Sequence, residues 1–321
     1  MRMLIIITAA TAAAYPALAG ADECPAKPTL ETYYKPAKLP ASGTRCKMEK
    51  GKCVKVELKG YLYMPKTAGK HPILIDNHGS EENPGDKCTN ASYFYNLGYI
   101  VFVPHRRGHG KSTGAYLDSY TKDFCSKPGD ANFCKMEYLH KQVDDVEEAI
   151  KFVKGLPNTA DKKIAIMGHS FGGITAVFAN TKDLGQRAVI DVAGGSQSWV
   201  GNPEASKQMD EAVRDAVAPA FFMEPLNDRS IDPTIELARA AGQACRVYQS
   251  AIFPALDTNG DGKVNAADYA TTDLRDKAHG GFMSAVADWG PAAHEFMTRF
   301  FEKPAQPFDK ACRGTSHEVN N

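Results

Sequence analysis

Short apolar runs alternate with stretches of helical periodicity along most of the chain. Near the amino-terminal end, Val54, Val56 and Leu58 alternate with charged residues and are followed by Tyr61-Leu62-Tyr63, a pattern typical of paired antiparallel strands. Beyond them the apolar runs become nearly continuous, which favours parallel strands covered on both faces. These runs cover residues 73–75, 100–103, 164–167, 189–193, 220–223 and 247–253.

Helix candidates lie between these runs. The strongest is 143–153, where Val143, Val146, Ile150 and Val153 fall on one face; the others are 174–180, 235–244 and 292–301. This alternation predicts an α/β fold with a doubly wound, mostly parallel sheet and antiparallel strands at its amino-terminal edge. Residues 196–218 are interpreted as an excursion between two strands, with Trp199 and Met209 available to line a pocket.

The first nineteen residues have the pattern of a signal peptide. A basic start, an apolar stretch from Leu4 to Ala14 and the box Ala17-Leu18-Ala19 predict export to the periplasm or the exterior, with cleavage near Ala19. No apolar run is long enough to span a membrane. We expect the chain to consist of four segments: a signal peptide at 1–19, an irregular segment at 20–53, the main domain at 54–312 and a tail at 313–321.

Charge and cysteine content narrow the possibilities further. The 321 residues include 38 Lys and Arg and 38 Asp and Glu, and without a basic surplus we expect no nucleic-acid partner. The chain has 8 cysteines, an even number that predicts disulfides in an exported protein. The local pairs Cys46–Cys53, around a Lys-Gly turn that could form a hairpin, and Cys125–Cys134 are plausible bridges, with free buried thiols as the alternative.

One segment has the pattern of a nucleophile elbow. An apolar strand runs into Gly168-His169-Ser170-Phe171-Gly172, and a helical pattern follows. In a G-x-S-x-G turn the flanking glycines avoid clashes, and the helix that follows favours a developing negative charge. Ser170 is therefore the candidate nucleophile.

A serine nucleophile needs a base and an acid that orients the base, and in this arrangement they follow the serine in the order acid, then histidine. His279, expected in a loop before the last helix, is the candidate base; His294 falls inside a helix pattern and His317 in the tail. Asp228, after the run 220–223, is the candidate acid. Glu224 and Asp191 are the alternatives for the acid.

An oxyanion hole needs two backbone N–H donors. One is expected from Phe171, the residue after the nucleophile. The second is expected from Ser80, in the loop after the strand at 73–75, where the chain reads His78-Gly79-Ser80. An ordinary strand-end turn is the alternative for this loop.

Together these residues resemble the α/β-hydrolase superfamily, specifically its dienelactone hydrolase-like and prolyl oligopeptidase-like branches. The resemblance covers roughly residues 54–302 and implies a Ser170–Asp228–His279 triad that cleaves carboxylic esters or related acyl bonds. It rests on His78-Gly79, Arg106 to Ser112, the elbow, Asn227-Asp228 and His279 to Phe282. The chain departs from relatives in having Ser170 rather than the cysteine of dienelactone hydrolases, and Glu224-Pro225 where many have His-Gly.

A second motif predicts a calcium site. Asp257 to Asp268 matches an EF-hand-type loop, with Gly262 at the sharp turn and Asp268, not Glu, at the last ligand position, which makes the loop similar to the dockerin variant. We expect a structural Ca²⁺ and no organic cofactor; an Asx-rich turn without an ion is the alternative. The expected ligands are Asp257, Asn259, Asp261, the carbonyl of Lys263, Asn265 and Asp268.

These observations predict an exported serine hydrolase, a carboxylesterase acting on a small-molecule or polymer ester through an acyl-enzyme. A dipeptidyl- or oligopeptidase-like peptidase is the first alternative. Such enzymes usually carry an extra substrate-selecting domain, and few residues precede the first strand here. The second alternative is an inactive hydrolase fold that binds a partner in the presence of calcium.

Overall fold

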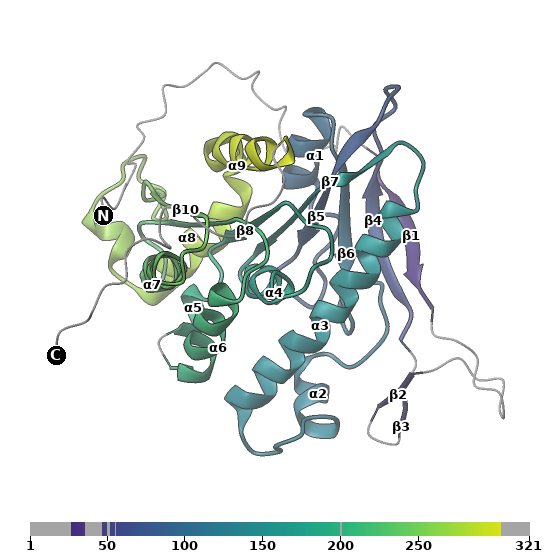
Figure 1. The fold of residues 1–321 in the computed structure, drawn as a ribbon. Helices are drawn as coiled ribbons and strands as arrows, with labels where there is room; N and C mark the ends of the chain where they lie inside the picture. Colours follow the sequence, from purple (N-terminus) through teal and green to yellow (C-terminus); the bar gives the residue numbers. More distant parts are fainter. Residues whose placement is uncertain (1–26, 36–46, 50–51, 55, 200, 303–321) are drawn as a thin grey trace.

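In the computed structural model, residues 27–35, 47–49, 52–54, 56–199 and 201–302 are described. Their strands form one sheet in the order β1-β4-β6-β5-β7-β8-β9-β10, and β2 and β3 form a separate hairpin (Figure 1). β1 and β4 run antiparallel to their neighbours and the remaining pairs are parallel, as the apolar runs predicted. The strands are β1 (Thr29–Tyr34), β2 (Lys47–Glu49), β3 (Lys52–Val54), β4 (Leu58–Tyr63), β5 (His71–Asn77), β6 (Ile100–His105), β7 (Thr159–His169), β8 (Ala188–Val192), β9 (Ala220–Pro225) and β10 (Tyr248–Phe253).

The amino-terminal edge differs from the sequence prediction. The segment 20–53, expected to be irregular, contributes β1, which pairs with β4 because Tyr33 packs into the core and donates its hydroxyl to the carbonyl of His105. The strand expected to begin at Val54 begins instead at Leu58. Val54 belongs to the β2–β3 hairpin, which confirms the hairpin expected around the Lys-Gly turn.

Helices cover both faces of the sheet, because successive strand residues point to opposite sides. Ile73, Ile75 and Phe222 pack towards α3, α4, α6 and α7, whereas Leu74 and Met223 pack towards α1, α8 and α9. Each of the four predicted helices is present, and each begins earlier in the chain than expected. The helices are α1 (Cys88–Asn96), α2 (Leu117–Asp123), α3 (Ala131–Lys154), α4 (Phe171–Ala179), α5 (Ser196–Trp199), α6 (Pro203–Arg214), α7 (Asp232–Gln243), η1 (Ala266–Tyr269), α8 (Thr272–Ser284) and α9 (Val286–Phe301).

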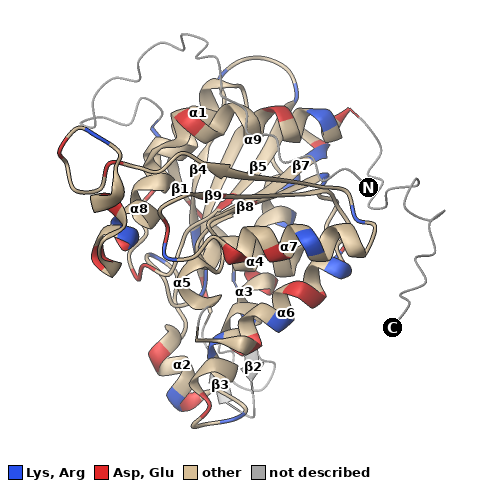
Figure 2. Cartoon of the chain, turned by 90° about the vertical axis from the view of Figure 1, so that its left-hand side faces the viewer, with Lys and Arg blue, Asp and Glu red and all other residues tan. Residues whose placement is uncertain are grey.

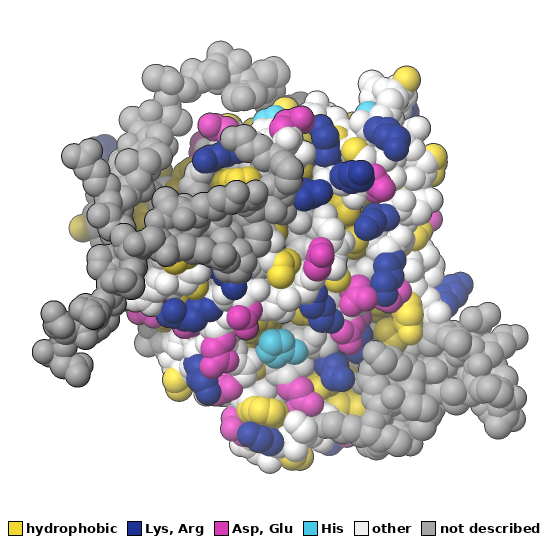
Figure 3. Space-filling model, viewed as in Figure 1, with side chains coloured by type: hydrophobic (Ala, Val, Ile, Leu, Met, Phe, Trp, Pro, Cys, Tyr) yellow, Lys and Arg dark blue, Asp and Glu magenta, His cyan; other side chains and the backbone are white. Residues whose placement is uncertain are grey.

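The expected excursion at 196–218 consists mainly of α5 and α6. Met209, which we expected near a pocket, is fully buried in the core, whereas Trp199 is partly buried against it and donates its indole N–H to Glu236. Acidic and basic side chains are interleaved on the helices and on the face of the molecule seen in the space-filling view (Figures 2 and 3).

Disulfides are present as the cysteine content predicted. Cys125 is bonded to Cys134, and Cys88 and Cys245 are disulfide-bonded as well. Cys46, the presumed partner of Cys53, lies outside the described residues, as do the expected signal peptide at 1–19 and the tail at 313–321. Within the described part of the chain, every helix is too short or too polar to cross a bilayer.

Candidate active site

The elbow lies at the centre of the sheet, between the end of β7 and the start of α4. Ser170 has φ 54° and ψ −119°, a strained conformation, and its N–H donates to the carbonyl of Val192 at 3.0 Å. Strain of this kind typically costs ~1–3 kcal/mol and persists only where packing enforces it. Here a Cβ on Gly168 would lie 2.1 Å from the oxygen of Gly172, so only glycine fits two residues before the serine.

The loop after β5 lies directly against the elbow. A Cβ on Gly172 would lie 2.0 Å from the carbonyl oxygen of Asn77, and a Cβ on Gly79 would lie 3.5 Å from the Cβ of Ser170. Among the described residues, the N–H groups of Phe171 and Ser80 donate no hydrogen bond to another protein group. Both predicted oxyanion donors therefore belong to segments that adjoin the candidate nucleophile.

Buried Arg106 holds this loop in place. Its Nη2 donates to the carbonyls of His78 and Gly79 at 2.8 and 3.0 Å, and its Nε donates to Gln142 of α3 at 2.7 Å. Burial lowers the pKa of Arg106 to about 10, which leaves the guanidinium charged at neutral pH. Arg106 thus fixes the backbone on which the second N–H donor depends.

Asp228 and His279, far apart in the sequence, meet beside the elbow. The Oδ2 atom of Asp228 accepts a hydrogen bond from Nδ1 of His279 at 2.8 Å, and both side chains are buried. The other ring nitrogen of His279, Nε2, is buried and has no hydrogen-bond partner among the described groups. His169, which precedes the nucleophile, bonds through its Nε2 to the carbonyl of His279 at 2.9 Å, so the base lies next to the elbow.

The environment of His279 differs from the loop expected for it, because the residue lies within α8. The Thr271 hydroxyl caps this helix by accepting the N–H of Leu274 at 3.2 Å, and Ala278 and Phe282 form its buried side. Two helical glycines each cost ~1 kcal/mol. Here the cap and the packing outweigh the cost of the Gly280-Gly281 pair.

The other acid and base candidates lie elsewhere. Burial, and then the charges of Asp228 and Asp191, raise the pKa of Glu224 well above its usual range, and its carboxyl oxygens have no hydrogen-bond partner among the described groups. Burial raises the pKa of Asp191 to about 7, and its carboxylate faces Gly173 and Gly194. His294 lies on α9 and bonds to the hydroxyl of Tyr99 at 2.9 Å, whereas His317 is outside the described residues.

Sequence reasoning missed the contribution of α5. Ser196 donates its hydroxyl to Oδ1 of Asp228 at 2.5 Å and accepts the N–H of Ser230 at 3.2 Å. Ser198 accepts a hydrogen bond from Lys135 of α3 at 2.8 Å. The segment gave a weak sequence pattern because it is four residues long and its role depends on contacts with two distant segments, the loop after β9 and α3.

The predicted calcium loop connects the acid to the base. Asn227, next to Asp228, forms two hydrogen bonds with the backbone of Leu256, at 2.8 and 2.9 Å. Leu256 immediately precedes Asp257, the first loop residue, and the loop ends at η1, which packs against α8. A change in this loop can therefore reach both Asp228 and His279.

The acidic and amide residues of the loop fit a cation only in part. Asn265 Nδ2 donates to Oδ2 of Asp261 at 3.2 Å and to the carbonyl of Lys263 at 3.3 Å, so two expected ligand oxygens converge on one donor. Asp257 accepts the N–H groups of Gly260 and Gly262, both at 2.8 Å. Asn259 accepts the N–H of Asp261.

Asp268, the expected last ligand, is buried and engaged with the backbone. It accepts the N–H groups of Asn265, Thr258 and Asn259 at 2.8, 2.8 and 3.1 Å, and these bonds, that of Asn265 first, lower the pKa of its carboxyl. The residues that fit an oxygen-ligated ion are thus Asp257, Asn259, Asp261 and the Lys263 carbonyl. Asn265, whose Oδ1 accepts the N–H of Ala267, and Asp268 instead close the loop. Among the described residues, including those of this loop, His, Cys, Asp and Glu form no group of three or more placed to hold a metal.

The sheet order and the helices on both of its faces are those of the α/β-hydrolase fold. Residues 30–192, just over half of the chain, match the acetyl xylan esterase (AXE1) family, and the protein belongs to that family. A comparison with curated protein sequences gave no significant match.

Solved structures share the fold at low sequence identity. An acylaminoacyl peptidase of Pyrococcus horikoshii matches with a TM-score of 0.54 and 17% identity over 88% of this chain and 43% of its own, so this chain spans less than half of that peptidase. Est1E of Butyrivibrio proteoclasticus, solved with ferulic acid bound, gives 0.52 and 16% over 79% of this chain and 98% of its own. An esterase of Pyrococcus furiosus gives 0.52 and 13% over 89% and 96%.

Proposed function

We propose that the protein is an exported serine carboxylesterase whose triad is Ser170, His279 and Asp228. The observation that carries the proposal is the 2.8 Å hydrogen bond between Asp228 and Nδ1 of His279. This histidine adjoins the elbow, and its Nε2 has no hydrogen-bond partner among the residues that the structure describes. An imidazole held by a carboxylate on one nitrogen can accept a proton on the other.

In the proposed reaction, the Ser170 hydroxyl attacks the acyl carbon while His279 Nε2 takes its proton. The oxyanion is held by the N–H groups of Phe171 and Ser80, at the amino-terminal end of α4 and on the loop that Arg106 fixes. His279 then protonates the alcohol that leaves. Water, deprotonated by the same imidazole, releases the acid from Ser170.

The family supports an ester of a short acyl group, and acetylated carbohydrates are the substrates to test first. An ester bond in a small molecule or on a polymer would suit the same chemistry. Disulfides at Cys88, Cys125, Cys134 and Cys245 support an oxidising compartment, in keeping with the signal peptide expected at 1–19.

We also propose that the loop from Asp257 to Asp268 binds a structural Ca²⁺. Calcium would neutralise Asp257 and Asp261 and would replace the amide donor that now joins Asp261 to the Lys263 carbonyl. Its role would be to order the connection between Asp228 and α8. All bond-making at the ester would remain with Ser170 and His279.

Labelling with a fluorophosphonate, combined with hydrolysis assays, tests the proposal. We expect wild type to be labelled and to hydrolyse acetyl esters, and Ser170→Ala to lose labelling and about 10⁴–10⁶ of kcat, as triad members typically do. Ser119→Ala, on the exposed side of α2, should behave like wild type. If Ser170→Ala retained a tenth of the wild-type turnover, the proposed triad would be refuted. If the wild type preferred peptide amides over every ester, the peptidase alternative would be favoured.

A further inference from the structure

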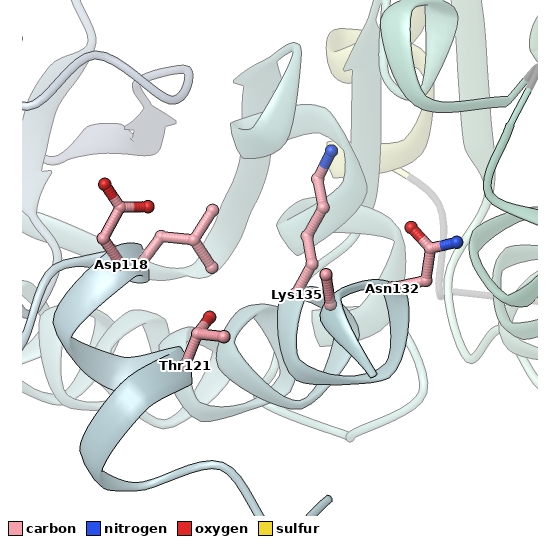
Figure 4. Close-up of a pocket in the computed structure, with 6 residues that line it drawn as sticks. Asp118, Thr121, Asn132 and Lys135 are labelled. Atoms are coloured by element: carbon pink, nitrogen blue, oxygen red, sulfur yellow. The ribbon is translucent and has the colours of Figure 1, made fainter. Parts of the chain in front are cut away.

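A cavity of about 340 Å³ lies between α2 and α3, close to the elbow (Figure 4). Four of its six lining residues have polar side chains, and its volume lies in the range of small-molecule sites. Figure 4 shows the side chains of Asp118 and Lys135 extending in the same direction from the two helices. The lining residues are Leu117, Asp118, Thr121, Ala131, Asn132 and Lys135.

Lys135 connects this cavity to the catalytic residues. Its Nζ lies 4.5 Å from the centre of the Phe171 ring, next to the candidate nucleophile, and donates to Ser198 at 2.8 Å. Ser198 is two residues from Ser196, which holds Asp228. A group bound at Lys135 would therefore lie beside the side chain of the residue that supplies an oxyanion N–H.

The ammonium of Lys135 has no carboxylate partner among the described residues. Phe171 and Ser198 are both neutral, and Asp118 lines the same cavity without forming an ion pair with the lysine. Burial lowers the pKa of Lys135 from its usual value. A partly buried cation with only neutral neighbours gains from an anionic ligand, because charge-assisted hydrogen bonds are the strong ones.

The connection between α2 and α3 holds the lysine in place. The disulfide between Cys125 and Cys134 closes this connection one residue before Lys135, and Asn132 donates to the carbonyl of Gly201 at 3.2 Å. Such constraints reduce the entropy that a binding side chain loses when a ligand is bound.

We propose that the cavity between α2 and α3 is a substrate subsite in which Lys135 binds a negatively charged group of the ester. The inference rests on the proposed esterase function and adds a preference for anionic over neutral esters. The negative charge can lie in the acyl part or in the alcohol part of the ester, and matched pairs of esters distinguish these two positions. Hydroxyl groups of the same substrate would find Thr121 and Asn132 on the cavity wall.

Two pairs of matched esters test the subsite. The para-nitrophenyl hemiester of glutaric acid and para-nitrophenyl pentanoate differ in charge on the acyl side, and para-acetoxybenzoate and its methyl ester differ on the alcohol side. The ratio of wild-type to variant kcat/KM on each ester cancels the intrinsic reactivity of that ester. For Lys135→Met we expect this ratio to be about tenfold larger for the charged member of one pair, the effect of one charge-assisted contact.

Two variants serve as controls. Lys135→Arg keeps the charge and should retain most of the preference, and Lys122→Met removes an exposed charge of α2 and should change neither ratio. Equal losses on charged and neutral esters in both pairs would overturn the subsite while leaving the esterase in place.

A binding measurement distinguishes failure of the Lys135 subsite from failure of the proposed esterase function. By calorimetry, the charged ester should bind Ser170→Ala about tenfold more tightly than it binds the double variant that also carries Lys135→Met. If wild type hydrolyses no ester, the proposed function fails, and this comparison still decides the subsite. Equal affinities of the two variants would overturn it.

Discussion

The candidate nucleophile region, around Ser170, and the candidate base region, around His279, are held by different forces. Around Ser170, backbone packs on backbone, and Cβ atoms added at Gly168 and Gly172 would lie 2.1 and 2.0 Å from carbonyl oxygens. Around His279, hydrogen bonds from side chains hold a surface connection, as those of Asn227 to Leu256 and of Asp268 to its loop show. Steric packing of backbone in the sheet centre does not depend on bound ions, whereas we expect the polar loop at the sheet edge to respond to them.

A pair of glycine variants tests this difference most strongly. Gly172→Ala should lower the free energy of unfolding by about 3 kcal/mol, because its Cβ would clash with the backbone of Asn77 and His78. Gly280→Ala, on exposed α8 with open space around it, should raise stability by about 0.5–1 kcal/mol. Urea unfolding measures both, and similar values for the two variants would contradict the comparison.

Removal of calcium should affect the base region next. An ion that binds only the ordered loop stabilises it by RT ln(1 + [Ca²⁺]/Kd), about 2.7 kcal/mol at a hundredfold excess over Kd. We expect chelation, or Asp257→Ala combined with Asp261→Ala, to lower both the Tm and kcat/KM. Asp161→Ala, an exposed acid at the start of β7, is the control. An unchanged Tm and unchanged kcat/KM after chelation would rule out the coupling.

A further expected effect concerns the pH dependence of stability and the buried acid beneath the elbow. The pKa of Asp191 is about 7 in the folded protein and about 3.9 in an unfolded chain, so between these values the folded state binds more protons. Wild-type stability from this group is therefore full below about pH 4 and is lost as the pH rises to about 7, by up to about 1.4 kcal/mol per pH unit.

Asp191→Asn should remove this slope, since the amide cannot ionise. Unfolding free energies of wild type and variant at several pH values between 4 and 8 measure the difference. Asp123→Asn, at the exposed end of α2, should keep the wild-type slope. Parallel pH profiles for wild type and Asp191→Asn would show that this carboxyl is not the source.

The sheet and the elbow could be predicted from sequence because each strand and the G-x-S-x-G turn are local patterns. Continuous apolar runs such as Ile73 to Ile75 indicate parallel strands, and glycines beside Ser170 indicate the turn. The strand β1 was missed because Tyr33 is its only fully buried residue and its partner, β4, is distant in the sequence. His279 was placed in a loop between the last strand and the last helix because the buried face of α8 is revealed only by packing.

The sequence by itself determined the α/β order of elements and the elbow with Ser170. It also identified Asp228 as the candidate acid and His279 as the candidate base. Only the tertiary structure decided that Asp228 meets His279, that Ser196 holds Asp228, and that Lys135 reaches Phe171 from a separate helix. The physical reason is that a turn or a strand depends on neighbours in sequence. A charge pair, or a cation beside a cavity, depends instead on which distant elements the core brings into contact.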